Sequence, residues 1–149
     1  SEVTKRLGPD GLTVTQKTFL ARMAEKSGVV KALLLDQAFI AGVGNIYADE
    51  SLFRAGIHPQ TKVATLTVEQ KKRLYSAVHF VLTDAVRRKG ANIDGVFEAG
   101  HFPVAVYGRS SLPCPVCHTL IEKIKVVQRG THFCPVCQPS QLAKPLKTR

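Results

Sequence analysis

The stretch Gly42-Val43-Gly44-Asn45 interrupts a part of the chain that is otherwise apolar and helix-forming. Two closely spaced glycines permit a tight, partly left-handed turn and let another backbone approach closely. Asparagine is a preferred N-cap, so Asn45 is expected to cap and start a helix whose first N–H groups point at the turn. Such a helix start attracts phosphate groups. The same four residues are also typical of a plain corner between two helices.

Apolar residues at helical spacing flank this turn on both sides. Before the turn, residues 16–26 and 29–36 predict two helices. After it, a third helix is expected over 45–56. The fourth helix has the clearest signal, because Thr67 and Gln70 predict a capping box and Gly90 ends a long apolar stripe. A helical module of about a hundred residues is therefore expected.

Beyond residue 91 the chain changes character. Residues 104–107, 121–127 and 131–133 predict short strands. A hairpin this small buries little apolar surface, so a metal must supply much of its stability. The expected parts, in chain order, are a turn-rich linker at 1–15, a helical module at 16–100, a zinc finger at 101–138 and a basic tail at 139–149 that is expected to be disordered.

The metal is predicted by two Cys-Pro-Val-Cys motifs, Cys114–Cys117 and Cys134–Cys137, which sixteen residues separate. Each turn can aim two thiolates at one ion, and a hairpin returns the second pair to complete a tetrahedron. Four sulfur ligands leave no position for a catalytic water, so one structural zinc ion is predicted. Disulfides and a redox-active pair are the alternatives, and the lack of a secretory signal argues against disulfides. His118 and His132 are expected to be exposed loop or hairpin residues.

The net charge of the chain limits the classes of molecule that it is expected to bind. Its 149 residues carry a formal net charge of +10, from 21 lysines and arginines against 11 acidic residues. From His101 onward, seven basic residues accompany a single acidic one, Glu122. This excess of positive charge favours a polyanionic partner. Nucleic acid, acidic proteins and ribosome-type partners are all consistent with it. No run of eighteen apolar residues occurs, so no membrane partner is expected.

Two groups of motifs carry a resemblance to one family. The first consists of Lys31-Ala-Leu-Leu-Leu-Asp36-Gln37, Gly42-Val-Gly-Asn-Ile-Tyr-Ala-Asp-Glu50 and Ala55-Gly-Ile-His-Pro59. The second consists of Val106-Tyr-Gly-Arg109 and Gln128-Arg-Gly-Thr-His-Phe-Cys134. In this order they resemble the helix-two-turn-helix and the zinc finger of formamidopyrimidine-DNA glycosylases and endonuclease VIII-type enzymes. The sequence is more similar to the formamidopyrimidine branch, which acts chiefly on oxidised purines.

The resemblance implies a mainly α fold with a small β zinc finger, in which a four-helix, helix-two-turn-helix module precedes a zinc-bound β-hairpin. It also implies DNA contacts. Asn45 would hydrogen-bond a phosphate beside the lesion, and Lys31 would lie near the damaged nucleotide. Arg129 would bind phosphates that flank the flipped nucleotide, a task for which a guanidinium is suited. Tyr107 and Arg109 complete the expected DNA-binding set.

Each of these residues also has a simpler interpretation. Lys31 is equally typical of a solvated lysine at a helix end, and Tyr107 of a ring packed beneath the finger. A lone arginine in a hairpin, such as Arg129, most often faces solvent. Glu50 and Asp36 are expected to be cap or surface residues.

In the family, the nucleophile is an N-terminal proline amine, assisted by a glutamate, in a separate β-sandwich domain. Ser1-Glu2-Val3 does not match that start. The resemblance therefore implies a fragment without catalytic residues, from a bifunctional DNA glycosylase and AP lyase of base-excision repair. The expected partner is double-stranded DNA with an oxidised base or an abasic site, bound by a monomer in the bacterial cytoplasm, at the nucleoid.

Two alternatives to this function stay open. The first is a non-enzymatic zinc-ribbon module that binds ribosomal RNA or a protein, since such ribbons and helical units also occur there. The second is catalysis by another amine of this chain, such as the N-terminus of Ser1 or the side chain of Lys31.

Overall fold

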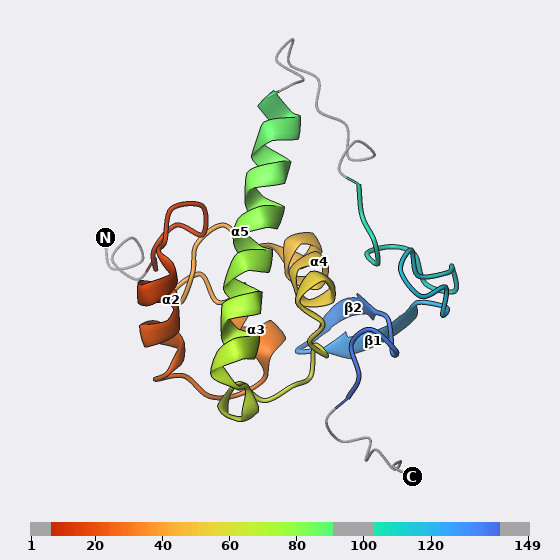
Figure 1. Ribbon diagram of the computed structural model, residues 1–149, viewed down its shortest axis with the longest axis horizontal. Coiled ribbons are helices and arrows are strands. Elements are labelled where there is room, and N and C mark those ends of the chain that lie inside the picture. The colour runs from red at the N-terminus through yellow and green to blue at the C-terminus, as the bar shows by residue number, and fades with distance from the viewer. Residues whose placement is uncertain (1–6, 91–102, 141–149) are drawn as a thin grey trace.

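The computed structural model describes residues 7–90 and 103–140. Its helices are α2 (Gln16–Met23), α3 (Val30–Leu35), α4 (Asn45–Ala55), the short 3-10 helix η1 (Val63–Thr65) and α5 (Val68–Gly90). An antiparallel hairpin of β1 (Glu122–Val126) and β2 (Arg129–Phe133) follows. The long α5 runs through the helical part, with α2 on one side and α4 and the hairpin on the other (Figure 1). The predicted fold class, mainly α with a small β zinc finger, is confirmed.

Helix α5 begins as its sequence predicts. The Gln70 N–H donates to Thr67 Oγ1 (3.0 Å), and the Thr67 N–H donates to Gln70 Oε1 (2.8 Å), which is a capping box. Its apolar stripe packs against α4 and α2, so that Leu74 is fully buried. None of the described helices is long and apolar enough to cross a lipid bilayer.

The turn-rich segment before α2 lies against the loop that precedes α4. The Gly8 N–H donates to the Gln37 carbonyl (2.8 Å), and the Ala41 N–H donates to the Pro9 carbonyl (2.9 Å). A Cβ atom on Gly8 would lie 2.6 Å from the carbonyl oxygen of Ala38, so only glycine fits this close approach. The segment that the sequence indicates as a linker therefore packs, over these residues, on the helical module.

The turn before α4 is braced by one side chain. Gln37 Oε1 accepts the Gly42 N–H (3.0 Å), and Gln37 Nε2 donates to the Val43 carbonyl (3.2 Å). Gly42 has a φ of +103°, which confirms the expected left-handed turn. The prediction that Asn45 caps α4 is wrong, because Gly44 occupies the N-cap and no side chain caps this helix. Asn45 is the first helical residue, and its amide is engaged elsewhere.

The hairpin confirms two of the three predicted strands, and the third prediction is wrong. Residues 105–108 bend and turn, and the N–H groups of Ala105, Val106 and Tyr107 all donate to the carboxylate of Glu50 at 2.8–3.0 Å. Successive N–H groups of a strand point to opposite sides and cannot converge on one carboxylate. Glu50 is buried on α4, so its expected place at the surface is also wrong.

Several expectations fall outside the described residues. They concern the start of the linker at 1–6, the last part of the helical module and the first residues of the finger at 91–102, and most of the basic tail at 141–149.

Candidate zinc centre and nucleic-acid interface

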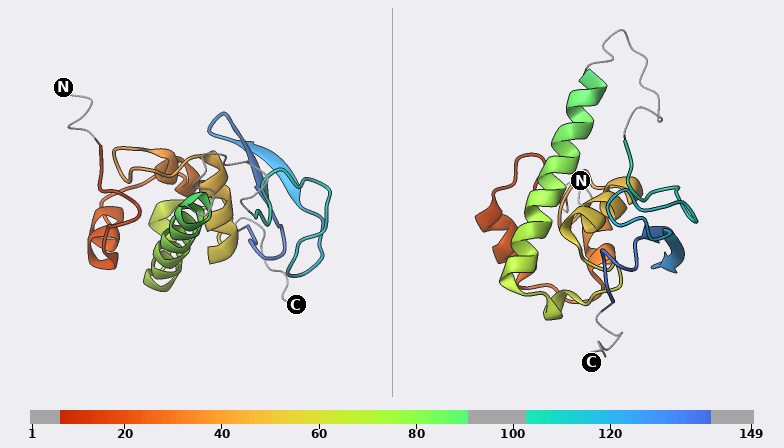
Figure 2. Two further views of the ribbon diagram at one scale, coloured as in Figure 1. Left: turned by 90° about the horizontal axis from the view of Figure 1, so that it is seen from above. Right: turned by 45° about the vertical axis from the view of Figure 1, so that its right-hand side comes forward.

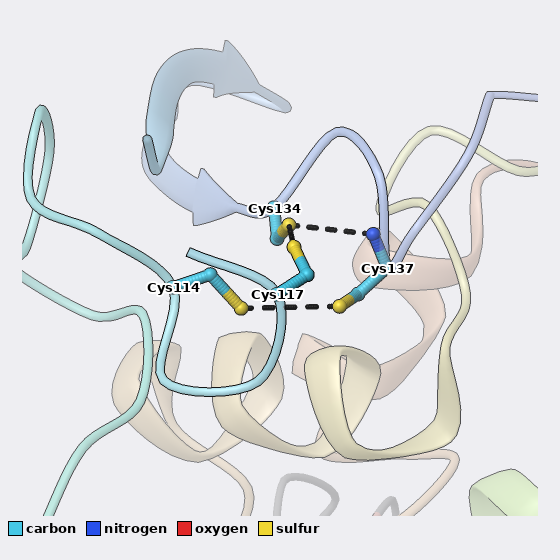
Figure 3. A group of neighbouring side chains, drawn as sticks. All are labelled: Cys114, Cys117, Cys134 and Cys137. Carbon is cyan, nitrogen blue, oxygen red and sulfur yellow. Dashed lines mark hydrogen bonds between the residues drawn. The ribbon is translucent and has the colours of Figure 1, made fainter. Parts of the chain in front are cut away.

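The four cysteines lie together, two on the loop before β1 and two directly after β2 (Figure 3). All four Sγ atoms lie within 4.8 Å of one another, and no disulfide joins them. The Sγ atoms of Cys114 and Cys137 are 3.8 Å apart, and those of Cys117 and Cys134 are 3.5 Å apart. A tetrahedral ion with Zn–S bonds of about 2.3 Å separates its sulfur ligands by about 3.8 Å. The residues therefore fit one structural zinc ion.

A backbone N–H group within each motif donates to the Sγ atom of that motif's first cysteine. The N–H groups of Val116 and Cys137 donate to the Sγ atoms of Cys114 and Cys134, each at 3.3 Å. Hydrogen bonds with Thr119 lower the pKa of Cys117 to about 6, whereas burial raises the pKa of Cys134. A bound zinc ion holds its ligands as thiolates, so it offsets the burial that opposes charge at Cys134.

A buried ion pair joins the hairpin to the helices. Lys31 Nζ on α3 lies 2.8 Å from Asp49 Oδ1 on α4, and both side chains are fully buried. The same Nζ donates to Thr131 Oγ1 (2.7 Å) and to the Gly130 carbonyl (3.2 Å), while Asp49 Oδ2 accepts the N–H of His132 (3.1 Å). The interpretation of Lys31 as a solvated lysine is therefore wrong.

The charges of this pair depend on each other. Burial lowers the pKa of Lys31 and raises the pKa of Asp49, and in each case the partner opposes the shift. A buried charge that loses its partner is strongly unfavourable, so Lys31 and Asp49 tie α3, α4 and β2 into one unit.

Two further contacts position the C-terminal end of β2, at Phe133 and Cys134, against the helical module. The buried amide of Gln138 accepts the Cys134 N–H (2.9 Å) and donates to the Ile57 carbonyl (3.0 Å). The buried ring of His58 meets the ring of Phe133 edge-on, with centroids 4.6 Å apart. No local pattern in the sequence indicated that Gln138 pairs with Ile57 or His58 with Phe133, because each pair joins residues more than seventy positions apart.

Asn45 and Arg129 are brought together from 84 positions apart in the sequence. Asn45 Nδ2 donates to the carbonyl of Gly130 (3.1 Å), the residue that follows Arg129 in β2. The Arg129 side chain is exposed, and the first turn of α4 carries no acidic residue. Arg129 thus belongs to the strand that contacts the first residue of α4, and a guanidinium near the start of a helix is a suitable environment for a phosphate.

The other residues predicted to contact DNA, Tyr107 and Arg109, lie in the finger and make contacts within the protein. The half-buried ring of Tyr107 meets the ring of His132 edge-on, with centroids 5.3 Å apart. His132 is buried, so its expected exposure is wrong, whereas His118 is exposed as expected. Arg109 Nη1 donates to the carbonyl of Ala105 (2.7 Å) and so braces the 105–109 turn.

The comparisons with known proteins match both parts of the chain. The formamidopyrimidine-DNA glycosylase H2TH domain matches residues 7–96, which is more than half of the chain. The zinc finger found in FPG and IleRS matches residues 111–139. The chain belongs to the formamidopyrimidine-DNA glycosylase family. This membership confirms the resemblance.

Members of this family share much of the sequence but are longer. Formamidopyrimidine-DNA glycosylases of Solibacter usitatus and Chloroflexus aggregans are 44% and 46% identical, over 89% and 88% of this chain. The matched regions are 53% and 50% of those proteins, so the chain spans about half the length of the curated relatives it matches.

Solved structures of the family have the same fold. The MutM (Fpg) protein of Thermus thermophilus superposes with a TM-score of 0.83 at 44% identity, covering 92% of this chain and 55% of that one. A Lactococcus lactis Fpg in complex with abasic-site DNA superposes with a TM-score of 0.80 at 34% identity, covering 93% and 54%.

Proposed function

We propose that these residues are the DNA-binding part of a base-excision-repair glycosylase and AP lyase that acts on oxidised purines in duplex DNA. The observation that carries the proposal is the exposed Arg129 beside Asn45 and the start of α4. Both side chains bind phosphates around the damaged nucleotide, and this grip helps to bend the duplex and extrude the base. Relatives bound to FAPY-dG DNA and to abasic-site DNA support this substrate class.

The other predicted contacts take different parts in this proposal. Lys31 is buried and does not contact DNA in this proposal. Its Nζ donates hydrogen bonds to the Gly130 carbonyl and to Thr131, and so positions the strand that carries Arg129. Tyr107, whose ring lies against His132 of β2, and Arg109, which braces the same turn, are proposed to contact DNA from the finger side. We further propose that the protein acts as a monomer on chromosomal DNA in the bacterial cytoplasm; the bacterial source of the relatives named above supports this location.

The 149 residues alone are proposed to bind DNA without cleaving it. Lys31, the internal amine considered as a nucleophile, is fully buried and paired with Asp49, so it cannot reach a sugar carbon. Treatment of the chain with borohydride and an abasic-site duplex is therefore expected to leave no covalent adduct. An adduct on any lysine or on the N-terminus would show that the chain is catalytic by itself.

Binding to a labelled duplex with one abasic-site analogue, with zinc present, tests the phosphate contacts. Arg129→Ala is expected to weaken binding roughly ten-fold at moderate salt. It should also make the slope of log K against log salt shallower by about 0.9, because one phosphate contact is lost. Asn45→Ala removes a neutral donor, so it should weaken binding with little change in slope.

Lys17 supplies a matched control for the loss of one positive charge. It is exposed on α2, which lies across α5 from the hairpin (Figure 1). Lys17→Ala should leave both the affinity and the slope nearly unchanged. If Arg129→Ala behaved like Lys17→Ala, Arg129 would not belong to a phosphate site and the proposed function would lose its main support.

A further inference from the structure

A groove runs between the C-terminal end of α4 and one face of α5, and we call it the α4–α5 groove. Two cavities of about 450 Å³ each form it, and Arg54 and Phe80 line both of them. Its floor is apolar and contains Phe53 of α4 together with Phe80 and Val81 of α5. Of the phenylalanine and tyrosine side chains that the structure describes, only Phe80 is exposed, at 44%. An exposed aromatic ring in an apolar groove is typical of a surface that binds a partner.

The rim of the groove is basic. The basic residues that line the two cavities are Arg54, Lys72, Arg73, Arg87 and Arg88, whereas the acidic ones are Glu50, Glu69 and Asp84. Two of the acidic residues already accept hydrogen bonds within the protein, Glu50 from the 105–107 turn and Asp84 from two of the arginines. The groove therefore combines an apolar floor with an excess of positive charge, so a partner of complementary charge would be acidic.

The fold holds two of the arginines in position. The Arg54 guanidinium lies over the ring of Phe80, 3.6 Å from its centroid. Arg73 Nε donates to the carbonyl of Ala55, at the end of α4 (3.3 Å). Both arginines are nevertheless exposed. A guanidinium that is already positioned loses less conformational freedom when it binds a carboxylate, and its planar shape suits that group.

The groove lies away from the proposed phosphate site. Asn45 starts α4 and Arg54 stands near its end, which places them about 14 Å apart along the helix axis at 1.5 Å per residue. In the left view of Figure 2, α4 extends away from the turn of the hairpin, with α5 beside it. Arg54 also covers a face of the Phe80 ring on which a base of single-stranded DNA could stack. The groove therefore suits a protein segment better than it suits DNA.

We propose that the α4–α5 groove binds an acidic peptide segment of another protein. Carboxylates of the segment pair with Arg54 and Arg73, and an apolar side chain beside them packs against Phe53 and Phe80. A second copy of this chain is a poorer occupant, because its own net charge is +10. The inference goes beyond the proposed function and does not depend on it, since it uses none of the residues assigned to DNA.

Selection of random displayed decapeptides on the 149-residue chain, with zinc present, tests this proposal. The enriched peptides are expected to combine acidic residues with a neighbouring aromatic or aliphatic residue. The most enriched peptide is then synthesised with a fluorescent label for equilibrium binding. Its affinity should fall roughly ten-fold in Arg54→Gln and in Phe80→Ala, and it should weaken as salt is added. Both variants should keep the zinc content and the abasic-duplex affinity of the natural chain, which shows that they are folded.

Val86→Ala and Lys17→Gln are the matched controls for the loss of an apolar group and of a charge. Val86 is an exposed valine on another face of α5, 53% accessible, where it lines a separate cavity with Leu12 and Leu82. Lys17 is exposed on α2. Both variants should bind the labelled peptide as tightly as the natural chain does.

Three results of this test would overturn the proposal. They are enrichment of peptides without acidic residues, no enrichment at all, and equal peptide affinity in the groove variants and the controls. If Arg54→Gln lowered affinity for the abasic-site duplex as strongly as Arg129→Ala does, the groove would be a second DNA surface and the peptide proposal would fail. Normal duplex binding by Arg129→Ala would remove the proposed function but not the peptide site.

Discussion

The helical module and the zinc finger differ in what fills their interiors. Among the described residues, the module buries a continuous cluster of nineteen apolar side chains, which includes Phe19, Leu52 and Leu74. The buried cluster of the finger consists of four side chains, Val106, Cys114, Ile121 and Cys134. Two of these four are zinc ligands, so the metal takes the place of a hydrophobic core.

The contact between the two regions is different again, because much of it is polar. Neighbouring carboxylates on α4 each hold a separate part of the finger: Asp49 accepts the His132 N–H, and Glu50 accepts three N–H groups of the 105–107 turn. Burial of such groups is favourable only when every partner is present. The finger therefore depends on zinc and on α4, whereas the module depends on its own apolar core.

Loss of the metal should reveal the largest difference in stability between the helical module and the zinc finger. Cys134→Ser removes one ligand, so the finger is expected to lose zinc and unfold, while the helices keep their apolar core. Zinc content, together with helical circular dichroism during heating, measures both effects. His118→Ser, at an exposed position beside the cysteines, should change neither. Simultaneous melting of the helices and the finger in Cys134→Ser would contradict the independence of the module.

The buried ion pair should have the next largest effect. Lys31→Met leaves Asp49 buried without its cation, which is expected to destabilise the protein by about 3–5 kcal/mol in urea unfolding. The double variant Lys31→Met with Asp49→Leu should recover part of this loss, because no unpaired charge remains. Lys125→Met, on an exposed lysine of β1, is the matched control and should be neutral. A neutral Lys31→Met would mean that the pair does not hold the two regions together.

The smallest effect is expected from pH at the contact between His58 and Phe133. Burial lowers the pKa of His58 below its ordinary value of 6.5, although Glu122 opposes this shift. The unfolded chain then binds the proton more readily, so stability is lost as the pH falls below 6.5. His58→Asn keeps an acceptor for the Gln60 N–H but cannot titrate. Its unfolding free energy should vary less between pH 7 and pH 5.5 than that of the natural chain; an equal variation would assign the pH effect to other groups.

Local signals in the sequence predicted most of the elements. The capping box of Thr67 and Gln70, the glycine end of α4 and the two cysteine motifs each depend on residues a few positions apart. The strand expected at 104–107 failed for the opposite reason. Its N–H groups bind Glu50, which lies 55 positions earlier in the chain, and no local pattern carries that information.

The sequence by itself determined the helical module and the four-cysteine zinc site, because periodicity, capping and ligand spacing are local properties. The family followed from the resemblance of its motifs, which comparison with known proteins confirmed. Only the tertiary structure decided that the Asn45 amide contacts the Gly130 carbonyl and that Lys31 is buried against Asp49. These outcomes depend on which groups find partners when α3, α4 and β2 meet. A buried polar group must be paired wherever its partner stands in the chain, and folding alone brings those partners together.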